Sequence, residues 1–478
     1  MIPIQSYQGR RVAVFGLGRT GIATAKALEA GGASVSCWDD SELSRERAAE
    51  QGLTLDDLNR RDWGDIAVLV LSPGVPLTHP KPHRVVELAQ AVGAPVIGDT
   101  ELFAMALNAL PPARRPKLVG ITGTNGKSTT TALIGHILNE TGRPAIVGGN
   151  IGDAILAQDP PRPGLHYVLE LSSYQIDLTR TLACDVAILL NISPDHIDRH
   201  GDFANYFAAK QRLFEMQEPG GKAVIGIDDD ETNAFFSRLR LRRPEEDVVP
   251  ISAGRVFARG VYALGGRVYD ALDGASHPVV DLQKAPALPG RHNAQNVAAA
   301  IAAVRLLGVS GRAAAKAVES FPGLAHRLQR VAQQDGVLYV NDSKATNGQA
   351  ALQALNSYAD IYWIAGGRPK DDGLDAVRPA LGRVTKAYLI GEAEDRFARE
   401  LEGQVSFERC GDLQTAIARA TSDARAAGRS GAVVLLAPAA ASFDQFTSFE
   451  ARGDAFCQLV KDELAAVDEP VVEREDAV

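Results

Sequence analysis

The chain has 478 residues and a formal net charge of −9, and a chain of this length folds into several domains rather than around one core. Its hydrophobic content of 45% is ordinary for a globular protein, and no run approaches the ~18 apolar residues that a membrane span needs. Because the charge is acidic and no dense Lys/Arg block is present, we do not expect non-specific binding to nucleic acid. The phosphates that it binds should therefore belong to small molecules.

Cysteine usage and the first residues predict the compartment. The four cysteines are widely scattered without a C-x-x-C pair, which argues against zinc sites and a disulfide framework. The N-terminal residues contain no positively charged region followed by an apolar core, so we see no secretion signal. We expect a cytoplasmic protein, monomeric and not inserted in a membrane.

The first motif of the chain is a glycine-rich turn. A short apolar strand at residues 11–15 runs into Gly16–Gly21, which matches G-x-G-x-x-G, and then into a helix. A second strand ends at Asp39, and dinucleotide-binding folds use an acidic residue near this distance to bind a ribose. Strand and helix patterns then alternate through residues 66–97 and predict a Rossmann-like domain. Taken alone, this motif favours an NAD-dependent dehydrogenase.

A second glycine-rich turn, Gly123–Thr129, follows the apolar strand at residues 118–122. The glycines let successive N–H groups face one anion, and the next helix adds its positive N-terminus. In such a loop Lys127 would contact the β- and γ-phosphates of a nucleotide, and Ser128 would offer its hydroxyl to Mg²⁺. The strict phosphate-loop pattern has a glycine where this chain has Ile121. An ordinary turn before a helix is the alternative.

Residues Gly123–Thr129 closely resemble the ATP loop of the Mur ligase superfamily, which also includes the folylpolyglutamate synthases. The resemblance implies an α/β fold of three domains. These are a Rossmann-like N-terminal domain for a UDP-linked substrate (1–98), a central P-loop ATPase-like domain (99–323) and a Rossmann-like C-terminal domain for the amino acid (324–478). It assigns the ATP loop to Gly123, Thr124, Asn125, Gly126, Lys127, Ser128 and Thr129.

By the same resemblance, the first motif binds UDP rather than NAD, since glycines and a helix N-terminus bind any pyrophosphate. The chain departs from the family after the aspartate, where it has Asp40-Ser41 in place of a Thr-Arg pair. The residues assigned to the UDP substrate are Gly16, Leu17, Gly18, Arg19, Thr20, Asp39, Ser72 and Asn150. A tight turn is the alternative for Asn150.

Several residues of the central domain are candidates for metal binding. Glu170 ends a buried strand, where a carboxylate is costly unless it is paired or bound to a cation such as Mg²⁺. Two histidines and two aspartates within residues 195–200 could form a metal cluster by themselves. The resemblance implies two Mg²⁺ ions held with Ser128, Glu170 and His196, and a carbamate on Lys210. A salt-bridged Glu170 and a solvated Lys210 are the alternatives. We also consider an acid–base role for His196.

The rest of the central domain carries fewer signals. We expect strands at 222–227, 256–264 and 267–269, and a long helix that follows Gly290–Asn296. The resemblance places Asn293 against adenine. It also implies that Arg327, in the segment leading to the third domain, reaches the ATP phosphates.

The third domain should select the amino acid. Strands at 337–341, 361–365, 387–390 and 433–436 predict a second doubly wound sheet. The stretch Tyr339–Asn347 resembles the branch of the family that adds D-glutamate, whose two carboxylates need cations and hydroxyls. The resemblance assigns Asp342 to ordering the site or binding ATP. It assigns D-glutamate to Lys344, Thr346, Lys370, Ser442 and Phe449.

The implied reaction is ATP-dependent ligation of D-glutamate to UDP-N-acetylmuramoyl-L-alanine through an acyl phosphate, in peptidoglycan synthesis. Lys127, Lys210, His196 and Arg327 would be its catalytic residues. Three alternatives remain: a ligase for another amino acid, the NAD-dependent dehydrogenase, and an inactive UDP-binding scaffold. Cofactor-dependent absorbance near the nicotinamide band would distinguish the dehydrogenase, and absence of ATP turnover would distinguish the scaffold.

Overall fold

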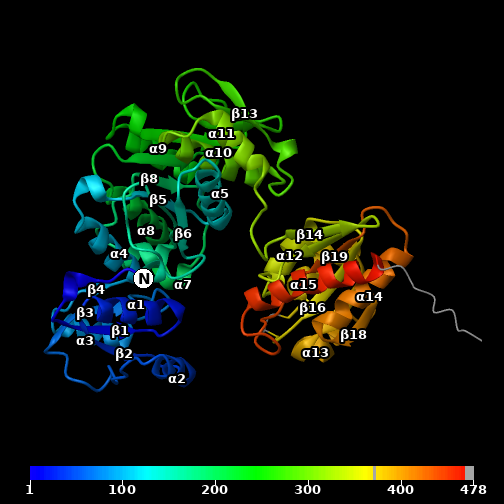
Figure 1. The fold of residues 1–478 in the computed structure, drawn as a ribbon, viewed down its shortest axis with the longest axis horizontal. Helices are drawn as coiled ribbons and strands as arrows, with labels where there is room; N and C mark the ends of the chain where they lie inside the picture. The colour runs from blue at the N-terminus through cyan, green and yellow to red at the C-terminus, as the bar shows by residue number, and fades with distance from the viewer. Residues whose placement is uncertain (370–372, 469–478) are drawn as a thin grey trace, which may run out of the picture. The chain divides into compact units, whose positions relative to one another are not determined.

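The computed structural model describes residues 1–369 and 373–468. It divides into two compact units, Met1–Phe321 and Pro322–Val478, each an α/β arrangement (Figure 1). Among the helices of the described residues, none combines the length and apolarity that crossing a bilayer requires.

The first unit begins with a parallel four-stranded sheet in the order β2-β1-β3-β4. Strands β1 and β3 are nearly continuous apolar runs, as expected for parallel strands that helices cover on both faces. The elements are β1 (Arg11–Phe15), α1 (Arg19–Ala30), β2 (Ser34–Trp38), α2 (Glu42–Glu50), β3 (Ile66–Leu71), α3 (Arg84–Ala91) and β4 (Val96–Ile97).

The same unit contains a nine-stranded sheet in the order β13-β12-β11-β10-β9-β8-β5-β7-β6. Its elements through the middle of the sheet are α4 (Asp99–Asn108), β5 (Lys117–Thr122), α5 (Lys127–Glu140), β6 (Ala145–Gly149), β7 (His166–Glu170), α6 (Ser173–Asp177), β8 (Val186–Leu189), α7 (Ile197–His200) and α8 (Phe203–Glu215). The remaining elements are β9 (Lys222–Gly226), α9 (Asp230–Arg240), β10 (Val248–Ser252), β11 (Val261–Leu264), β12 (Arg267–Asp270), β13 (His277–Asp281), α10 (Arg291–Leu306) and α11 (Gly311–Glu319).

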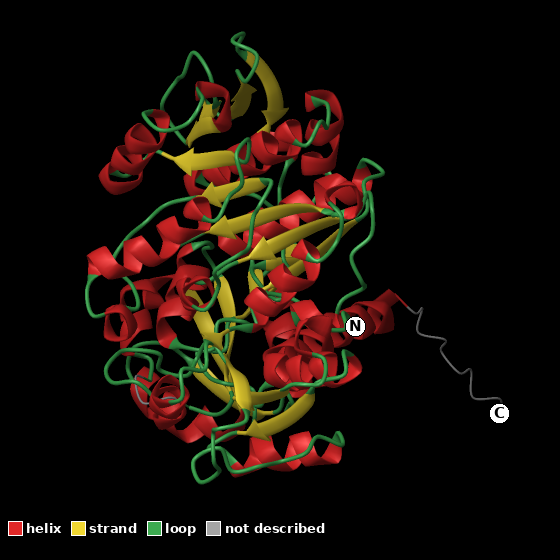
Figure 2. Ribbon diagram, turned by 90° about the vertical axis from the view of Figure 1, so that its left-hand side faces the viewer, coloured by secondary structure: helices red, strands yellow, loops and turns green. Residues whose placement is uncertain are grey.

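Strand order places the phosphate loop at the middle of this sheet. β5 lies between β8 and β7, and all three strands are parallel. The segments that follow them therefore meet at one edge of the sheet. Figure 2 shows the strands of the sheet running between helices, and α5 and α10 pack together on one face around a shared apolar cluster.

One predicted strand was partly wrong. We expected a strand over 256–264, but only Val261–Leu264 is extended in the sheet. Gly260 has a φ of +143°, and a Cβ there would collide with the carbonyl oxygen of Pro250. The chain turns at this glycine, which leaves Val256 exposed in a loop.

The second unit contains a six-stranded sheet in the order β14-β15-β19-β16-β17-β18, with only β14 antiparallel to its neighbour. Helices α14 and α15 pack on one face, and α12 and α13 pack on the other, which confirms the expected doubly wound architecture. The elements are β14 (Gln329–Gln334), β15 (Val337–Asn341), α12 (Gly348–Asn356), β16 (Ile361–Gly366), β17 (Val384–Ile390), α13 (Glu394–Leu401), β18 (Phe407–Gly411), α14 (Leu413–Ala426), β19 (Val433–Leu436) and α15 (Phe449–Asp468).

Candidate active site

The turn between β5 and α5 has the geometry of a phosphate-binding loop. Gly123 and Gly126 have φ values of +145° and +83°, which glycine adopts readily. Asn191, which follows β8, accepts the Thr124 N–H on its carbonyl oxygen at 3.0 Å and the Asn125 N–H on its side chain at 2.9 Å. The loop is therefore held from a neighbouring strand at the N-terminus of α5, where the helix dipole favours an anion.

Lys127 folds back over this loop. Its Nζ donates to the carbonyl oxygens of Gly123 and Thr124, at 3.0 and 2.8 Å. These carbonyls keep the ammonium group beside the turn. The positive charge is therefore where a nucleotide phosphate bound in the loop would need it.

Substitution Gly126→Ala should weaken ATP binding. The added Cβ would collide with Oδ1 of Asn296, and the positive φ strains any other residue. Strain of this kind costs about 1–3 kcal/mol, so we expect the KM for ATP to rise about tenfold. Gly142→Ala at the other end of α5 is the matched control, because Gly142 has a φ of +74° and open space around its Cβ position. Equal KM values for the two variants would contradict the prediction.

Lys210 on α8 contacts the same phosphate loop through its side chain. Its side chain is 1% exposed, and its Nζ donates to the carbonyl oxygen of Gly123 at 2.9 Å. Burial, followed by the nearby charge of Lys127, lowers the pKa of Lys210 to about 7. Nζ also lies 4.7 Å from the centre of the Tyr206 ring. The alternative of a solvated helix lysine is therefore wrong.

Glu170 ends β7, next to β5. The residue is 3% exposed, and its Oε1 accepts from Asn150 at 2.9 Å. Within the part of the chain that the structure describes, its buried Oε2 has no hydrogen-bond partner. A salt bridge does not explain this carboxylate. A buried oxygen without a donor fits a divalent cation, because a cation would offset the cost of its burial.

His196 lies beside the loop on a strained backbone. Its φ is +53°, immediately before α7. The side chain is 46% exposed, with Nε2 3.4 Å from the Asp195 carboxylate and its ring against Tyr174. The hypothesis that residues 195–200 form a metal cluster by themselves is wrong, since the described residues contain no group of three or more His, Cys, Asp or Glu arranged for a metal. The His200 side chain is buried, and its Nε2 lies 2.9 Å from the Ser173 hydroxyl oxygen.

Helix α10 borders the loop with two asparagines. The Asn296 side chain lies against Gly126 and donates to Oδ1 of Asn293 at 3.0 Å. Asn293 is buried, and its Nδ2 donates to the carbonyl oxygen of Pro289 at 2.8 Å. The asparagine predicted to contact adenine thus lies next to the residue that touches the phosphate loop.

The first glycine motif forms a second anchored turn. Asp39 accepts the N–H groups of Leu17, at 2.6 Å, and Ser41, at 2.8 Å, on its two carboxylate oxygens. Ser72 donates to the carbonyl oxygen of Gly16 at 2.9 Å. Leu17 is buried between these contacts. Gly18 and Arg19 are exposed at this turn.

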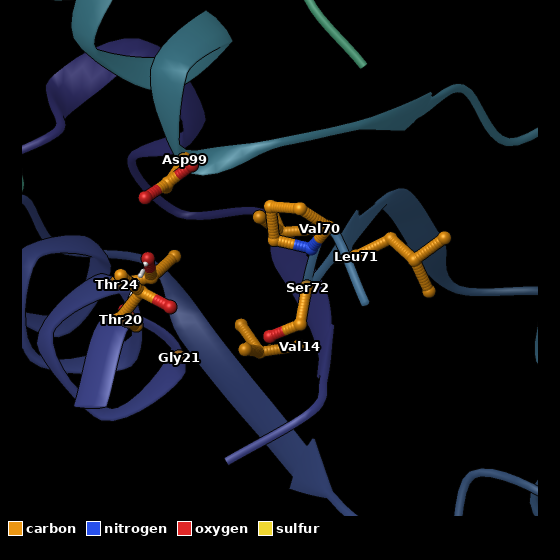
Figure 3. Close-up of a pocket in the computed structure, with 9 residues that line it drawn as sticks. Val14, Thr20, Gly21, Thr24, Val70, Leu71, Ser72 and Asp99 are labelled. Atoms are coloured by element: carbon orange, nitrogen blue, oxygen red, sulfur yellow. Dashed lines mark hydrogen bonds between the residues drawn. The ribbon is translucent and has the colours of Figure 1, made fainter. Parts of the chain in front are cut away.

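A small cavity lies behind this turn, as Figure 3 shows. Thr20 and Thr24 of α1, Ser72 after β3, and Asp99 at the start of α4 line it, and the Asp99 carboxylate points toward Thr24. Burial raises the pKa of Asp99. Ser72 lies beside Gly16 and Gly21, so the cavity borders the glycine-rich turn.

In the second unit, the predicted residues gather where β15 and β19 end. The Lys344 ammonium lies 5.1 Å from the centre of the Phe449 ring, and the Thr346 N–H donates to the Lys344 carbonyl oxygen at 2.8 Å. Burial raises the pKa of Asp342 to about 6, and this carboxylate accepts the Leu328 N–H at 3.1 Å. The buried Ser442 follows β19. Arg327 is exposed, and Lys370 lies outside the described residues.

Comparisons with known proteins identify the chain. Residues 121–304 match the Mur ligase middle domain and residues 326–440 match the Mur ligase glutamate ligase domain. The UDP-N-acetylmuramoylalanine–D-glutamate ligase of Phenylobacterium zucineum is 53% identical, over 96% of this chain and 98% of that protein. The chain belongs to the Mur ligase family.

Two further comparisons agree with that assignment. The ligase of the same name from Caulobacter vibrioides is 52% identical to this Mur ligase, over 95% of this chain and 96% of that protein. The crystal structure of UDP-N-acetylmuramate-alanine ligase from Thermotoga maritima superposes with a TM-score of 0.57 at 14% identity, covering 95% of this chain and 99% of that chain. It supports the fold alone. The dehydrogenase hypothesis, which rested on the first motif, is wrong.

Sequence reasoning missed three residues of this Mur ligase that shape the site. Asn191 holds the phosphate loop, Tyr206 bonds Thr124 through its hydroxyl at 3.1 Å, and Gln295 bonds Asn191 at 3.1 Å. Asn191 had a usable signal, because a polar residue directly after a buried parallel strand lies at the edge where ligands bind. Tyr206 had none, since an aromatic residue on an amphipathic helix usually packs in a core.

Proposed function

We propose that this enzyme joins D-glutamate to UDP-N-acetylmuramoyl-L-alanine and converts one ATP to ADP and phosphate, as a step of peptidoglycan synthesis. The observation that carries the proposal is a sequence identity of about 50%, over nearly the full length of the chain, to ligases named for this reaction. The geometry of the phosphate loop supports ATP as the energy source, because Lys127 and Lys210 both bond the carbonyl of Gly123 beside Glu170.

The proposed chemistry has two steps. A carboxylate oxygen of the UDP substrate attacks the γ-phosphorus of ATP, giving an acyl phosphate and ADP. The D-glutamate amine then attacks the acyl carbon, phosphate leaves, and the amine loses a proton as the amide forms. Lys127 would offset the charge on the transferred phosphoryl group, and Arg327 would assist it. His196 lies beside the loop and is our candidate to accept the amine proton.

We further propose two Mg²⁺ ions, held by Ser128, Glu170 and His196 and by Lys210 as its carbamate. Bound there, the ions would neutralise phosphate charge. The unpartnered Oε2 of Glu170 supports a cation at this place. Lys210 supports the carbamate, because burial and Lys127 lower its pKa enough to leave a neutral amine near pH 7. A neutral amine adds CO₂ and releases a proton.

The second unit would bind the amino acid. We propose that Lys344, Thr346, Lys370, Ser442 and Phe449 contact D-glutamate, and that Asp342 orders the site. The contact between Lys344 and Phe449 supports a shared pocket. In the first unit, Asn293 would contact adenine, and the anchored turn of Gly16, Gly18, Arg19, Thr20, Asp39 and Ser72, with the Leu17 backbone and Asn150, would bind the UDP substrate.

We keep the three-domain division 1–98, 99–323 and 324–478 as part of this proposal, each domain serving one substrate. The four-stranded sheet ends at Ile97 and the next helix begins at Asp99, which supports the first boundary. Because both nucleotide substrates are cytoplasmic metabolites, we propose that the enzyme works in the cytoplasm, and we propose a monomer.

The test is phosphate release from ATP. We expect release only when UDP-N-acetylmuramoyl-L-alanine and D-glutamate are both present, with L-glutamate, meso-diaminopimelate and L-lysine inactive as replacements for D-glutamate. The product should carry one new amide bond by mass spectrometry. Turnover with another amino acid would overturn the substrate assignment, and no ATP turnover at all would overturn the proposed activity.

A further inference from the structure

A buried histidine joins the two segments that carry the proposed metal ligands. His200 ends α7, and its side chain is only 4% exposed. Its Nε2 lies 2.9 Å from the hydroxyl oxygen of Ser173, and its Nδ1 lies 3.5 Å from the Asp177 carboxylate. Both partners belong to α6, so His200 connects α7 to α6.

The three side chains have the connectivity of a Ser-His-Asp nucleophile, but they cannot act as one. Ser173 is 0% exposed, so no substrate reaches its hydroxyl. Burial lowers the pKa of His200 to about 4, so the ring is neutral at physiological pH. With the Asp177 carboxylate facing Nδ1–H, Nε2 accepts from Ser173. The arrangement is a fixed structural connection.

The hydrogen bond between His200 and Ser173 links the segment that follows Glu170 to the helix that follows His196. Ser173 follows Glu170 by three residues, and a capping box of Ser172 and Gln175 fixes the start of α6. On the other side, the N–H of His200 donates to the carbonyl oxygen of His196 at 3.2 Å. His200 therefore bonds to both segments at once.

The backbone at His196 needs such support. A histidine with a φ of +53° is strained, and a four-residue helix contributes little stability of its own. The ring of His200 also packs between Tyr174 of α6 and Tyr206 of α8, at centroid distances of 5.7 and 5.5 Å. The bond from His200 to Ser173 is thus an interior side-chain hydrogen bond between α7 and α6.

We propose that His200 is a positioning residue that sets the spacing between Glu170 and His196. The inference rests on the proposed role of these two residues in holding Mg²⁺. Magnesium requires near-ideal octahedral geometry at about 2.0–2.1 Å, so a small displacement of one ligand weakens binding. When a residue that supports a metal ligand is replaced, the affinity for the metal typically falls about 10- to 100-fold.

The experiment measures Mn²⁺ binding by electron paramagnetic resonance on the intact protein in the presence of ADP. His200→Phe keeps a ring but removes both nitrogens, and Ser173→Ala removes the other half of the bond. We expect each variant to bind Mn²⁺ about tenfold more weakly. The double variant should lose no more Mn²⁺ affinity than either single variant, because each of the three variants lacks the same hydrogen bond between His200 and Ser173. In turnover, the Mg²⁺ requirement should rise while the KM for D-glutamate stays within about twofold.

His136→Phe is the matched control. His136 also bonds a serine, Ser320, at 3.1 Å and packs against an aromatic ring, but it joins α5 to the end of α11. The His136→Phe variant should bind Mn²⁺ with the same affinity as the wild type. If His200→Phe and Ser173→Ala bind Mn²⁺ as tightly as the wild type, the proposal is overturned. If the wild type itself binds no Mn²⁺ beyond that held by ADP, the metal assignment fails instead.

Discussion

Substitution Lys127→Ala is expected to abolish turnover while the protein stays folded. The ammonium group lies over the phosphate loop on the carbonyls of Gly123 and Thr124, where it would meet charge that develops on the transferred phosphoryl group. Removal of one preorganised donor at such a position costs about 10²–10³ in kcat, and we expect at least that loss. The measurement is phosphate release under saturating substrates, with circular dichroism to verify the fold.

Lys117→Ala provides the control for that variant. Lys117 begins the strand whose other end carries the loop, and it forms an exposed ion pair with Asp185 at 2.6 Å. Exposed pairs contribute about 0–1 kcal/mol, so this variant should retain full activity. Near-normal turnover of Lys127→Ala would remove the assignment of Gly123–Thr129 as the ATP loop.

Substitution Lys210→Ala is expected to be nearly as severe, and to respond to added carboxylates. If Lys210 acts as a carbamate, its function depends on an anion that a short carboxylate such as acetate or formate can replace in the space left by the side chain. We therefore expect an inactive variant that regains part of its activity with millimolar acetate or formate. Lys210→Arg should also be inactive, because it keeps the positive charge and cannot form a carbamate.

The pH dependence tests the same group in the unmodified protein. Because burial and Lys127 lower the pKa of Lys210 to about 7, the amine is protonated at pH 6 and neutral at pH 8. Only the neutral amine adds CO₂, so bicarbonate should restore CO₂-depleted enzyme more fully at pH 8 than at pH 6, where most of the amine is protonated. As a control for the carboxylate rescue of Lys210→Ala, the Lys127→Ala variant should stay inactive with added acetate or formate. A fully active Lys210→Arg variant would contradict the carbamate.

Local order in the sequence was sufficient to find the two glycine-rich turns. A strand, glycines at positions of positive φ, a lysine and a helix follow one another within Leu118–Ile134, so the motif can be read from adjacent residues. The motif at Gly16–Gly21 is local in the same sense, although Asp39 and Ser72, which bond to this turn, lie 22 and 56 residues from their partners. The predicted strand at 256–264 was partly wrong, since only Val261–Leu264 is a strand. Gly260 turns the chain where the carbonyl of Pro250 lies against it, a contact that no local pattern contains.

The surroundings of the phosphate loop came only from the tertiary structure. Lys210 and Gly123 are 87 residues apart in the sequence, and Asn191 and Asn125 are 66 apart. They meet because β5 lies between β7 and β8, and strand order is a property of the whole sheet rather than of any segment. Burial is non-local in the same way. On its helix Lys210 reads as a solvated lysine, and only desolvation by the assembled core gives it a lowered pKa.

The sequence by itself therefore determined the fold class, the two glycine-rich turns and the candidates within them, because these motifs are made of a few adjacent residues between a strand and a helix. The tertiary structure decided that Glu170 has a buried oxygen without a hydrogen-bond partner among the described residues, that Lys210 is buried beside Lys127, and that His200 faces Ser173 instead of joining His196 in a cluster. Each of these depends on which distant groups exclude water from a side chain, and that is fixed only when the strands and helices pack together.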